Sequence, residues 1–163
     1  MKEYTLGIDL GSGSIKLTLL GRDGKIAAVQ GCEYPTEFPC PGWSEQDPAK
    51  WCDALCHALK RLCTQSVHPA EIRGIAVDAA THTAVLLDEA VRPLGNAILW
   101  TDQRSGEEVA RLKERYADLI KRETLNTPTT VWTMPQFLWL KKHRPAVWEK
   151  VRHIHFAKDY LRY

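Results

Sequence analysis

The chain has 163 residues, of which 44% are hydrophobic and 26% are charged, and its formal net charge at pH 7 is +2. These values are typical of a globular protein, and the length is enough for one compact domain with a core. The small charge, without a basic cluster among aromatic residues, argues against a nucleic-acid partner. The N-terminus leads directly into a predicted strand, so neither secretion nor membrane insertion is expected, and a cytoplasmic protein is favoured.

Residues 6–20, LGIDLGSGSIKLTLL, predict two strands joined by a tight turn. An apolar run carrying one acid, Asp9, breaks at residues 11–14 and then resumes with an alternation of period 2. The glycines of the turn are expected to supply positive φ. An acid at the end of a buried strand needs a cation or a hydrogen-bond donor. The turn, with Lys16 behind it, can cradle a phosphate whose Mg²⁺ is held by Asp9. The alternative is an ordinary hairpin whose turn Asp9 caps.

The next segment predicts a meander, a loop and a helix. Asp23-Gly24 is a hairpin-turn signal, and residues 25–34 predict a third strand. Four prolines and a glycine within residues 35–48 predict a loop. At its end Asp47 and Pro48 predict the N-cap and first residue of a helix that ends near Gln65.

Five cysteines occur, without the paired spacing of metal ligands: Cys32, Cys40, Cys52, Cys56 and Cys63. The last three share one face of the predicted helix with leucines, which favours packing in the core. A zinc site formed by these thiols with His57 is the alternative. Reduced thiols fit a cytoplasmic protein.

Two further polar stretches follow predicted strands. Residues 74–78 and 84–88 predict two paired strands whose connection carries Thr81 and His82. Residues 97–104 place a Trp, an acid and an Arg at the end of a strand, before a helix over about 105–121. The structural alternatives are a His satisfied within the fold, a helix cap and a surface ion pair.

The last 40 residues predict mainly helices. An apolar band over residues 132–140 is stopped at Pro145, a short strand follows at 154–156, and a helix opens at Asp159. Strands and helices in this order predict a mixed α/β fold.

Four stretches carry a resemblance to a known family: LGIDLGSGSIKLTLL, PGWSEQDPAKW, AILWTDQRS, and the pair WTMPQFLWLKK with FAKDYLRY. Together they resemble the FGGY carbohydrate kinases, most closely the xylulokinase-like members. The first stretch is also similar to the phosphate motif of the actin-like ATPase superfamily. The resemblance implies an actin-like, ribonuclease H-like α/β domain, with a mixed sheet that begins as an antiparallel meander and is flanked by helices. Residues 1–163 are then an incomplete N-terminal domain without the adenosine-binding domain.

The resemblance also implies roles for individual residues. Asp9 matches the acid that supports the metal and the phosphate. The positions that match the phosphate turn and the lysine behind it are Gly11, Ser12, Gly13, Ser14 and Lys16. The positions that match residues at the sugar are Thr81, His82, Trp100, Asp102 and Arg104. Sugar hydroxyls need paired donors and acceptors, and an aromatic ring suits the C–H face of a sugar.

The implied activity is transfer of the γ-phosphate of ATP, with Mg²⁺, to a hydroxyl of a ketopentose such as D-xylulose. The segment before His82 lacks the Gln and Met usual there, and Gln136 replaces a common Lys. A kinase for ribulose, glycerol or another polyol is therefore one alternative, and a non-catalytic truncated actin-like fragment is another. A chaperone or cell-division ATPase shares only the first motif. The general base is expected beyond residue 163, so this stretch alone is expected to be inactive, and self-association into a homodimer stays open.

Overall fold

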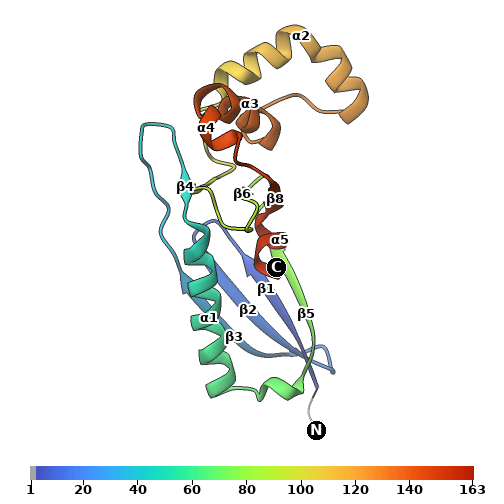
Figure 1. Ribbon diagram of the computed structural model, residues 1–163. Coiled ribbons are helices and arrows are strands. Elements are labelled where there is room, and N and C mark those ends of the chain that lie inside the picture. Colours follow the sequence, from blue (N-terminus) through green and yellow to red (C-terminus); the bar gives the residue numbers. More distant parts are fainter. Residues whose placement is uncertain (1–2) are drawn as a thin grey trace. The chain divides into compact units, whose positions relative to one another are not determined.

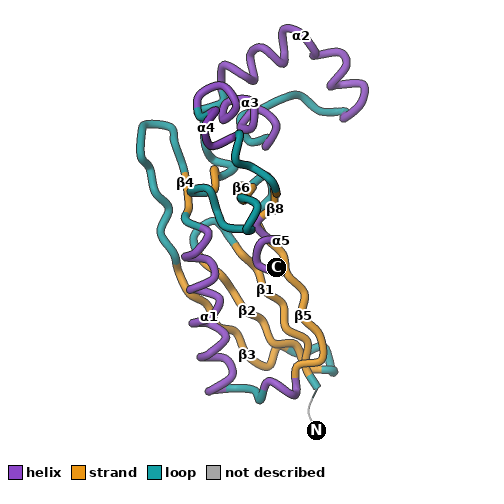
Figure 2. Tube along the Cα trace, in the orientation of Figure 1, coloured by secondary structure: helices purple, strands orange, loops and turns teal. Residues whose placement is uncertain are grey.

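The computed structural model describes residues 3–163 (Figures 1 and 2), and the chain divides into two compact units. Unit 1 contains the residues up to Thr36 together with Asp47–Ala80 and Ala157–Tyr163. Unit 2 contains Glu37–Gln46 and Thr81–Phe156. Among the helices of the described residues, none has both the length and the apolar character that spanning a bilayer requires.

Unit 1 is built on a four-stranded sheet in the order β3-β2-β1-β5. Its strands are β1 (Tyr4–Leu10), β2 (Ser14–Gly21), β3 (Ile26–Glu33) and β5 (Ile72–Ala79). The first three form an antiparallel meander, and β5 pairs with β1 in parallel. The predicted meander and the mixed character of the sheet are confirmed.

The core of unit 1 lies between this sheet and the helix α1 (Pro48–Gln65), which runs along it in Figure 1. Alternate residues of β1 and β2 are buried: Leu6, Ile8, Leu10, Ile15, Leu17 and Leu19. Helix α1 begins as predicted, because the Asp47 carboxylate accepts a hydrogen bond from the Ala49 amide and Pro48 is the first residue.

The face of α1 that enters the core differs from the prediction. Its buried residues are Pro48, Trp51, Ala54, Ala58 and Leu62. Cys52 and Cys63 are only half-buried, and Cys56 is exposed. The large Trp51 ring and the small alanines set the rotation of the helix, so the cysteines fall at its margin.

Two elements complete unit 1, a short 3₁₀ helix η1 (Pro69–Glu71) before β5 and the helix α5 (Ala157–Arg162). The rings of Trp51 and Tyr160 meet edge to face at 6.3 Å, which joins α1 to α5. The strand predicted over residues 74–78 is part of β5, which lies at the edge of the sheet, and its Ile75 is 63% exposed.

Unit 2 combines a small antiparallel sheet with helices. The strand order is β4-β7-β6-β8, and the strands are β4 (Glu45–Gln46), β6 (Ala84–Leu87), β7 (Ala97–Ile98) and β8 (His153–Phe156). The helices are α2 (Gly106–Thr124), kinked at Tyr116, α3 (Thr133–His143) and α4 (Pro145–Trp148). The predicted end of the apolar helix before Pro145 and the predicted strand at 154–156 are confirmed.

The prediction that residues 74–78 pair with residues 84–88 is wrong. Strand β5 belongs to the sheet of unit 1, whereas β6 pairs with β7 and β8 in unit 2. The chain leaves unit 1 at Ala80 and enters unit 2 at Thr81. Both runs are apolar because each packs within its own unit, and apolar character alone does not identify a strand's partner.

Candidate functional site

Tyr34 and Thr36 hold the turn between β1 and β2 through hydrogen bonds to its backbone carbonyls. The carbonyl oxygens of Gly11 and Ser14 accept hydrogen bonds from the Tyr34 hydroxyl at 2.6 and 3.2 Å. The Gly13 carbonyl accepts from the Tyr34 amide at 3.1 Å, and the Ser12 carbonyl from the Thr36 hydroxyl at 3.4 Å. All four carbonyls of the turn are therefore engaged by the protein.

The Gly11 amide donates to the Ser14 carbonyl, and the three residues that follow Gly11 lie at the surface. Ser12, Gly13 and Ser14 are exposed, and their carbonyls point back toward Tyr34 and Thr36. Successive backbone amides with nearby hydroxyls can form an anion-binding concavity. The exposed turn is compatible with a phosphate group, and phosphate binding here stays a prediction.

Tyr34 was not recognised from the sequence, although an aromatic residue before a proline at the end of β3 is a signal for it. Its side chain is buried, and burial, followed by the nearby Asp9 carboxylate, raises the pKa of the Tyr34 hydroxyl well above its ordinary value. The hydroxyl therefore remains a neutral donor to the two carbonyls that it holds.

The glycines of the turn act differently from the prediction. Among the described residues, the glycines with positive φ are Gly24, Gly42 and Gly95, so neither glycine of the phosphate turn has this conformation. At Gly11 a Cβ atom would lie 3.2 Å from the Ser14 carbonyl oxygen, which closes the turn by accepting from the Gly11 amide. Gly11 is thus required for close approach of the backbone rather than for its φ angle.

Asp9 lies near the end of β1, whose alternate residues are buried, but its own side chain is exposed. Because β1 alternates, Ile8 and Leu10 face the core and the Asp9 side chain faces solvent, where it is 56% exposed. Lys16 lies opposite on β2, with its Nζ 3.9 Å from an Asp9 carboxylate oxygen. Asp78 is in register with Asp9 on the parallel strand β5. Two carboxylates therefore stand beside each other on one face of the sheet, with an ammonium group next to them.

His82 lies in the connection from β5 to β6 and has a left-handed backbone, with a φ of 56°. The residue is half-buried, and Thr81 before it is exposed. Histidine is among the non-glycine residues that tolerate this region, at a cost of order 1–3 kcal/mol that the surrounding structure must offset. The structure thus holds His82 in a specific backbone conformation at a point where its ring remains partly accessible.

Asp102 and Arg104 form a buried pair, so the alternative of a surface ion pair is wrong. The guanidinium donates two hydrogen bonds to the carboxylate, at 2.9 Å from Nε and 2.8 Å from Nη2. The Asp102 carboxylate also accepts from the backbone amides of Ser44 and Arg104, at 2.7 and 2.8 Å. Both carboxylate oxygens are therefore saturated by the protein. The alternative of a helix cap is also wrong, since the N-cap of α2 is Ser105.

Arg104 has three further partners that the sequence analysis did not connect. Its Nη2 lies 2.7 Å from a carboxylate oxygen of Glu45, and its guanidinium carbon lies 3.8 Å from the ring centre of Trp43 and 5.1 Å from that of Trp139. A planar cation over an aromatic ring gains cation–π stabilisation, here mainly from Trp43 at the shorter distance. The stretch PGWSEQDP contains two of these partners, and its resemblance to the family was the available signal.

A cavity of about 200 Å³ in unit 2 is bordered by Trp43, Glu45 and Arg104, together with residues of α3. Gln136 of α3 is buried and donates to the Leu99 carbonyl at 3.2 Å, next to Trp100. Trp100 itself is 40% exposed. The structure thus separates the predicted sugar residues into a buried group, Asp102 and Arg104, and an accessible group that includes His82 and Trp100.

Comparisons with known proteins identify the same family that the sequence stretches resemble. Residues 4–163 match the FGGY family of carbohydrate kinases, N-terminal domain. The xylulose kinase of Bacillus subtilis is 35% identical over 99% of this chain and 32% of its own length. The glycerol kinase of Thermococcus gammatolerans is 32% identical over 92% of this chain and 31% of its own length. The crystal structure of gluconate kinase from Lactobacillus acidophilus matches with a TM-score of 0.92 at 25% identity, covering 99% of this chain and 32% of that chain. The present chain spans about a third of the length of the curated relatives that it matches.

Proposed function

Because the chain belongs to the FGGY family of carbohydrate kinases, we propose that the whole protein transfers the γ-phosphate of ATP to a hydroxyl of a sugar, most favourably a ketopentose such as D-xylulose. The observation that carries the proposal is the turn between β1 and β2, whose four carbonyls are bonded by the protein and whose residues Ser12, Gly13 and Ser14 are exposed beside Asp9. ATP is the second substrate, and we place the protein in the cytoplasm, where ATP is available and the five free cysteines stay reduced.

Unit 1 supplies the phosphate-binding part of the proposal. The amides of Ser12 and Gly13 and the hydroxyls of Ser12 and Ser14 donate to phosphate oxygens, and the Lys16 ammonium adds positive charge. The carboxylates of Asp9 and Asp78 fit a hard cation such as Mg²⁺, directly or through water, which neutralises phosphate charge when bound. Asp78 adds a second carboxylate to the one that the sequence analysis assigned.

Unit 2 supplies the sugar-binding part. We propose that His82 and Thr81 hydrogen-bond to sugar hydroxyls and that the exposed Trp100 ring lies against the C–H face. The saturated Asp102 and the paired Arg104 are assigned a positioning role, because their groups already bond to the protein. They fix the backbone immediately after Trp100.

The choice of sugar rests on the relatives. The curated relatives named above are a xylulose kinase and a glycerol kinase, at 35% and 32% identity, so the family is better supported than the substrate. A kinase for ribulose, glycerol or another polyol is therefore the alternative within the same family. A non-catalytic fragment is the alternative for the 163 residues alone.

The test uses the protein at the full length that its gene encodes, in a coupled assay of ADP release with Mg²⁺-ATP and a panel of sugars. D-xylulose is expected to give the highest kcat/KM among xylulose, ribulose, glycerol and gluconate. Asp9→Asn is expected to lower kcat by a factor of 100 or more, roughly the range for removing a group that stabilises developing charge. The matched control is Asp23→Asn, at the next hairpin turn, where a lysine also lies beside the acid. Equal activity of the two variants would contradict the role of Asp9.

A further inference from the structure

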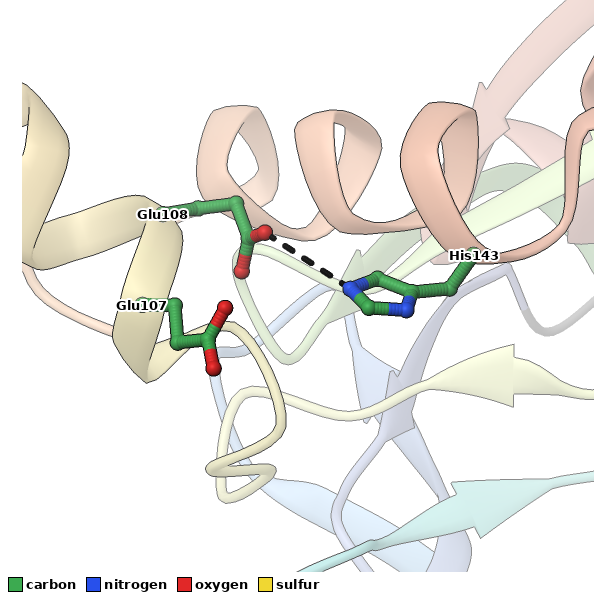
Figure 3. A group of neighbouring side chains, drawn as sticks. All are labelled: Glu107, Glu108 and His143. Atoms are coloured by element: carbon green, nitrogen blue, oxygen red, sulfur yellow. Dashed lines mark ion pairs between the residues drawn. The ribbon is translucent and has the colours of Figure 1, made fainter.

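A second cluster of charged side chains lies in unit 2, where helix α2 begins and helix α3 ends. Glu107 and Glu108 are in the first turn of α2, and His143 is the last residue of α3 (Figure 3). One ligand atom from each of the three lies within 4.8 Å of the others. The proposed kinase site involves none of these residues.

Glu108 is the unusual member of this cluster. Its side chain is 3% exposed, and neither carboxylate oxygen has a hydrogen-bond partner among the described residues. Its nearest nitrogen groups are the Lys142 Nζ at 3.8 Å and the His143 Nε2 at 3.9 Å, both beyond hydrogen-bonding distance. A buried carboxylate left in this state costs several kcal/mol unless another group compensates it.

The local sequence would allow the Glu108 carboxylate to accept a hydrogen bond in a capping box, but this bond does not form in the described residues. Ser105-Gly106-Glu107-Glu108 is a capping-box sequence, in which the glutamate at the third helical position would accept from the Ser105 amide. No such bond forms: the Ser105 hydroxyl is buried without a partner, and the cap makes no side-chain hydrogen bond. In Figure 3 the Glu108 carboxylate instead turns toward the His143 ring.

We propose that Glu107, Glu108 and His143 form a binding site for a divalent transition-metal ion, with Zn²⁺ as the best fit. Two carboxylates and one imidazole are a suitable set for zinc, which takes three protein ligands and one water in open sites. Ligand atoms around a tetrahedral zinc ion lie about 3.4 Å apart, given bonds of about 2.0–2.2 Å. The present spacing therefore closes by small side-chain rotations. Stacking of the His143 ring on Trp139, at 4.9 Å, holds the imidazole in place.

Lys142 acts as a competing internal cation. Its Nζ donates to a Glu107 carboxylate oxygen at 2.9 Å and lies 3.8 Å from Glu108, in the region that a metal ion would take. Its side chain is 38% exposed, so it can swing into solvent when a divalent ion with greater charge arrives. Other cations face the cluster from α2 and α3, namely Arg111, Arg115 and Lys141, which border the adjoining cavity and are exposed. Solvent and salt screen these exposed charges.

The experiment titrates the metal-free full-length protein with Zn²⁺ by calorimetry and with Co²⁺ by visible absorption. One ion is expected to bind with a nitrogen–oxygen spectrum that lacks the charge-transfer band of a cysteine thiolate. Glu108→Gln is expected to weaken this binding by more than the roughly 10- to 100-fold that losing an outer-shell partner costs. Glu114→Gln, an exposed glutamate on the same helix, is the matched control and is expected to bind normally.

The Lys142→Met variant decides between a metal site and a closed ion-pair network. Removing the competing ammonium is expected to tighten Zn²⁺ binding several-fold, whereas Lys141→Met is expected to leave it unchanged. The proposal is overturned if Lys142→Met does not tighten binding, if Glu108→Gln binds as the native protein does, or if the Co²⁺ spectrum shows thiolate ligation. These readouts do not depend on sugar-kinase activity, so the failure of either proposal is separable from that of the other.

Discussion

Two carboxylate–cation pairs, one in each unit, differ in almost every physical respect. In unit 1 the Lys16 ammonium lies 3.9 Å from the Asp9 carboxylate, and the two side chains are 59% and 56% exposed. In unit 2 the Arg104 guanidinium lies 2.8 Å from the Asp102 carboxylate, and the two side chains are 3% and 0% exposed. The family resemblance assigns both pairs to the kinase site, but the two pairs differ in how many hydrogen-bonding groups they leave available to a ligand.

The difference lies in which groups remain available. Asp102 has committed both oxygens to two amides and a guanidinium, so a sugar could bind to it only by breaking bonds of the protein. Asp9 on β1 and Lys16 on β2 lie across from each other without a close contact, next to a turn whose residues Ser12, Gly13 and Ser14 are exposed. A side chain that binds a ligand keeps hydrogen-bonding positions that no protein group uses. A positioning side chain has its hydrogen-bonding positions occupied by protein groups.

The largest expected effect is on stability, from the buried pair. Arg104→Met leaves the Asp102 and Glu45 carboxylates without their cation, and breaking a buried pair in this way costs about 3–5 kcal/mol. Urea denaturation measures the free energy of unfolding. The control is Arg92→Met, which breaks a surface pair with Asp88 at 2.9 Å and is expected to cost no more than about 1 kcal/mol. Equal losses in the two variants would show that burial adds nothing to the Arg104 pair.

A middle-sized effect is expected at Tyr34, which joins the exposed region to the core. Tyr34→Phe removes the donor to the part-buried Gly11 and Ser14 carbonyls, and losing such hydrogen bonds costs about 0.5–1.5 kcal/mol each. The same variant is expected to lower kinase activity through a looser phosphate turn. If the free energy of unfolding does not change, the hydroxyl is not the element that holds the turn.

Tyr34 also predicts a dependence of stability on alkaline pH. Its folded-state pKa is raised above the ordinary value of 10.0, so the unfolded chain loses this proton first. Stability from Tyr34 is therefore complete below pH 10 and declines above it, by about 1.4 kcal/mol per pH unit for one proton. Cys52 and Tyr160 also have raised pKa values, and both remain in Tyr34→Phe. The difference between the two proteins in urea midpoint across this pH range isolates the contribution of Tyr34.

Much of unit 1 could be predicted from local sequence. The hairpin, the Asp23-Gly24 turn and the helix from Pro48 to Gln65 depend on neighbouring residues, such as turn glycines, an alternating strand and an N-cap followed by proline. The positions of these elements are confirmed. The face of a helix that is buried depends on distant partners, so the placement of Cys56 in the core was wrong.

The candidate site was less predictable because it depends on contacts far apart in the sequence. Asp102 bonds to the Ser44 amide, 58 residues away, and Arg104 stacks against Trp43 and Trp139. The spacing of the three residues in Trp-x-Asp-x-Arg carries no information about these partners. Likewise, the apolar runs around His82 belong to two sheets, and the sequence shows their strand character but not their pairing.

The smallest expected effect is the coupling between Asp9 and Lys16, and it provides the sharpest contrast with the buried pair. A double-mutant cycle with Asp9→Asn and Lys16→Met is expected to give a coupling energy of only about 0.2–1 kcal/mol in the free energy of unfolding, because both side chains are more than half exposed. High salt is expected to remove most of that coupling, whereas a cycle with Asp102→Asn and Arg104→Met should retain its larger coupling under the same conditions. A salt-resistant coupling above about 2 kcal/mol between Asp9 and Lys16 would mean that these groups are held for stability as tightly as the buried pair. The exposure of the Asp9–Lys16 pair would then no longer support phosphate binding at the turn, even if Asp9→Asn abolished turnover.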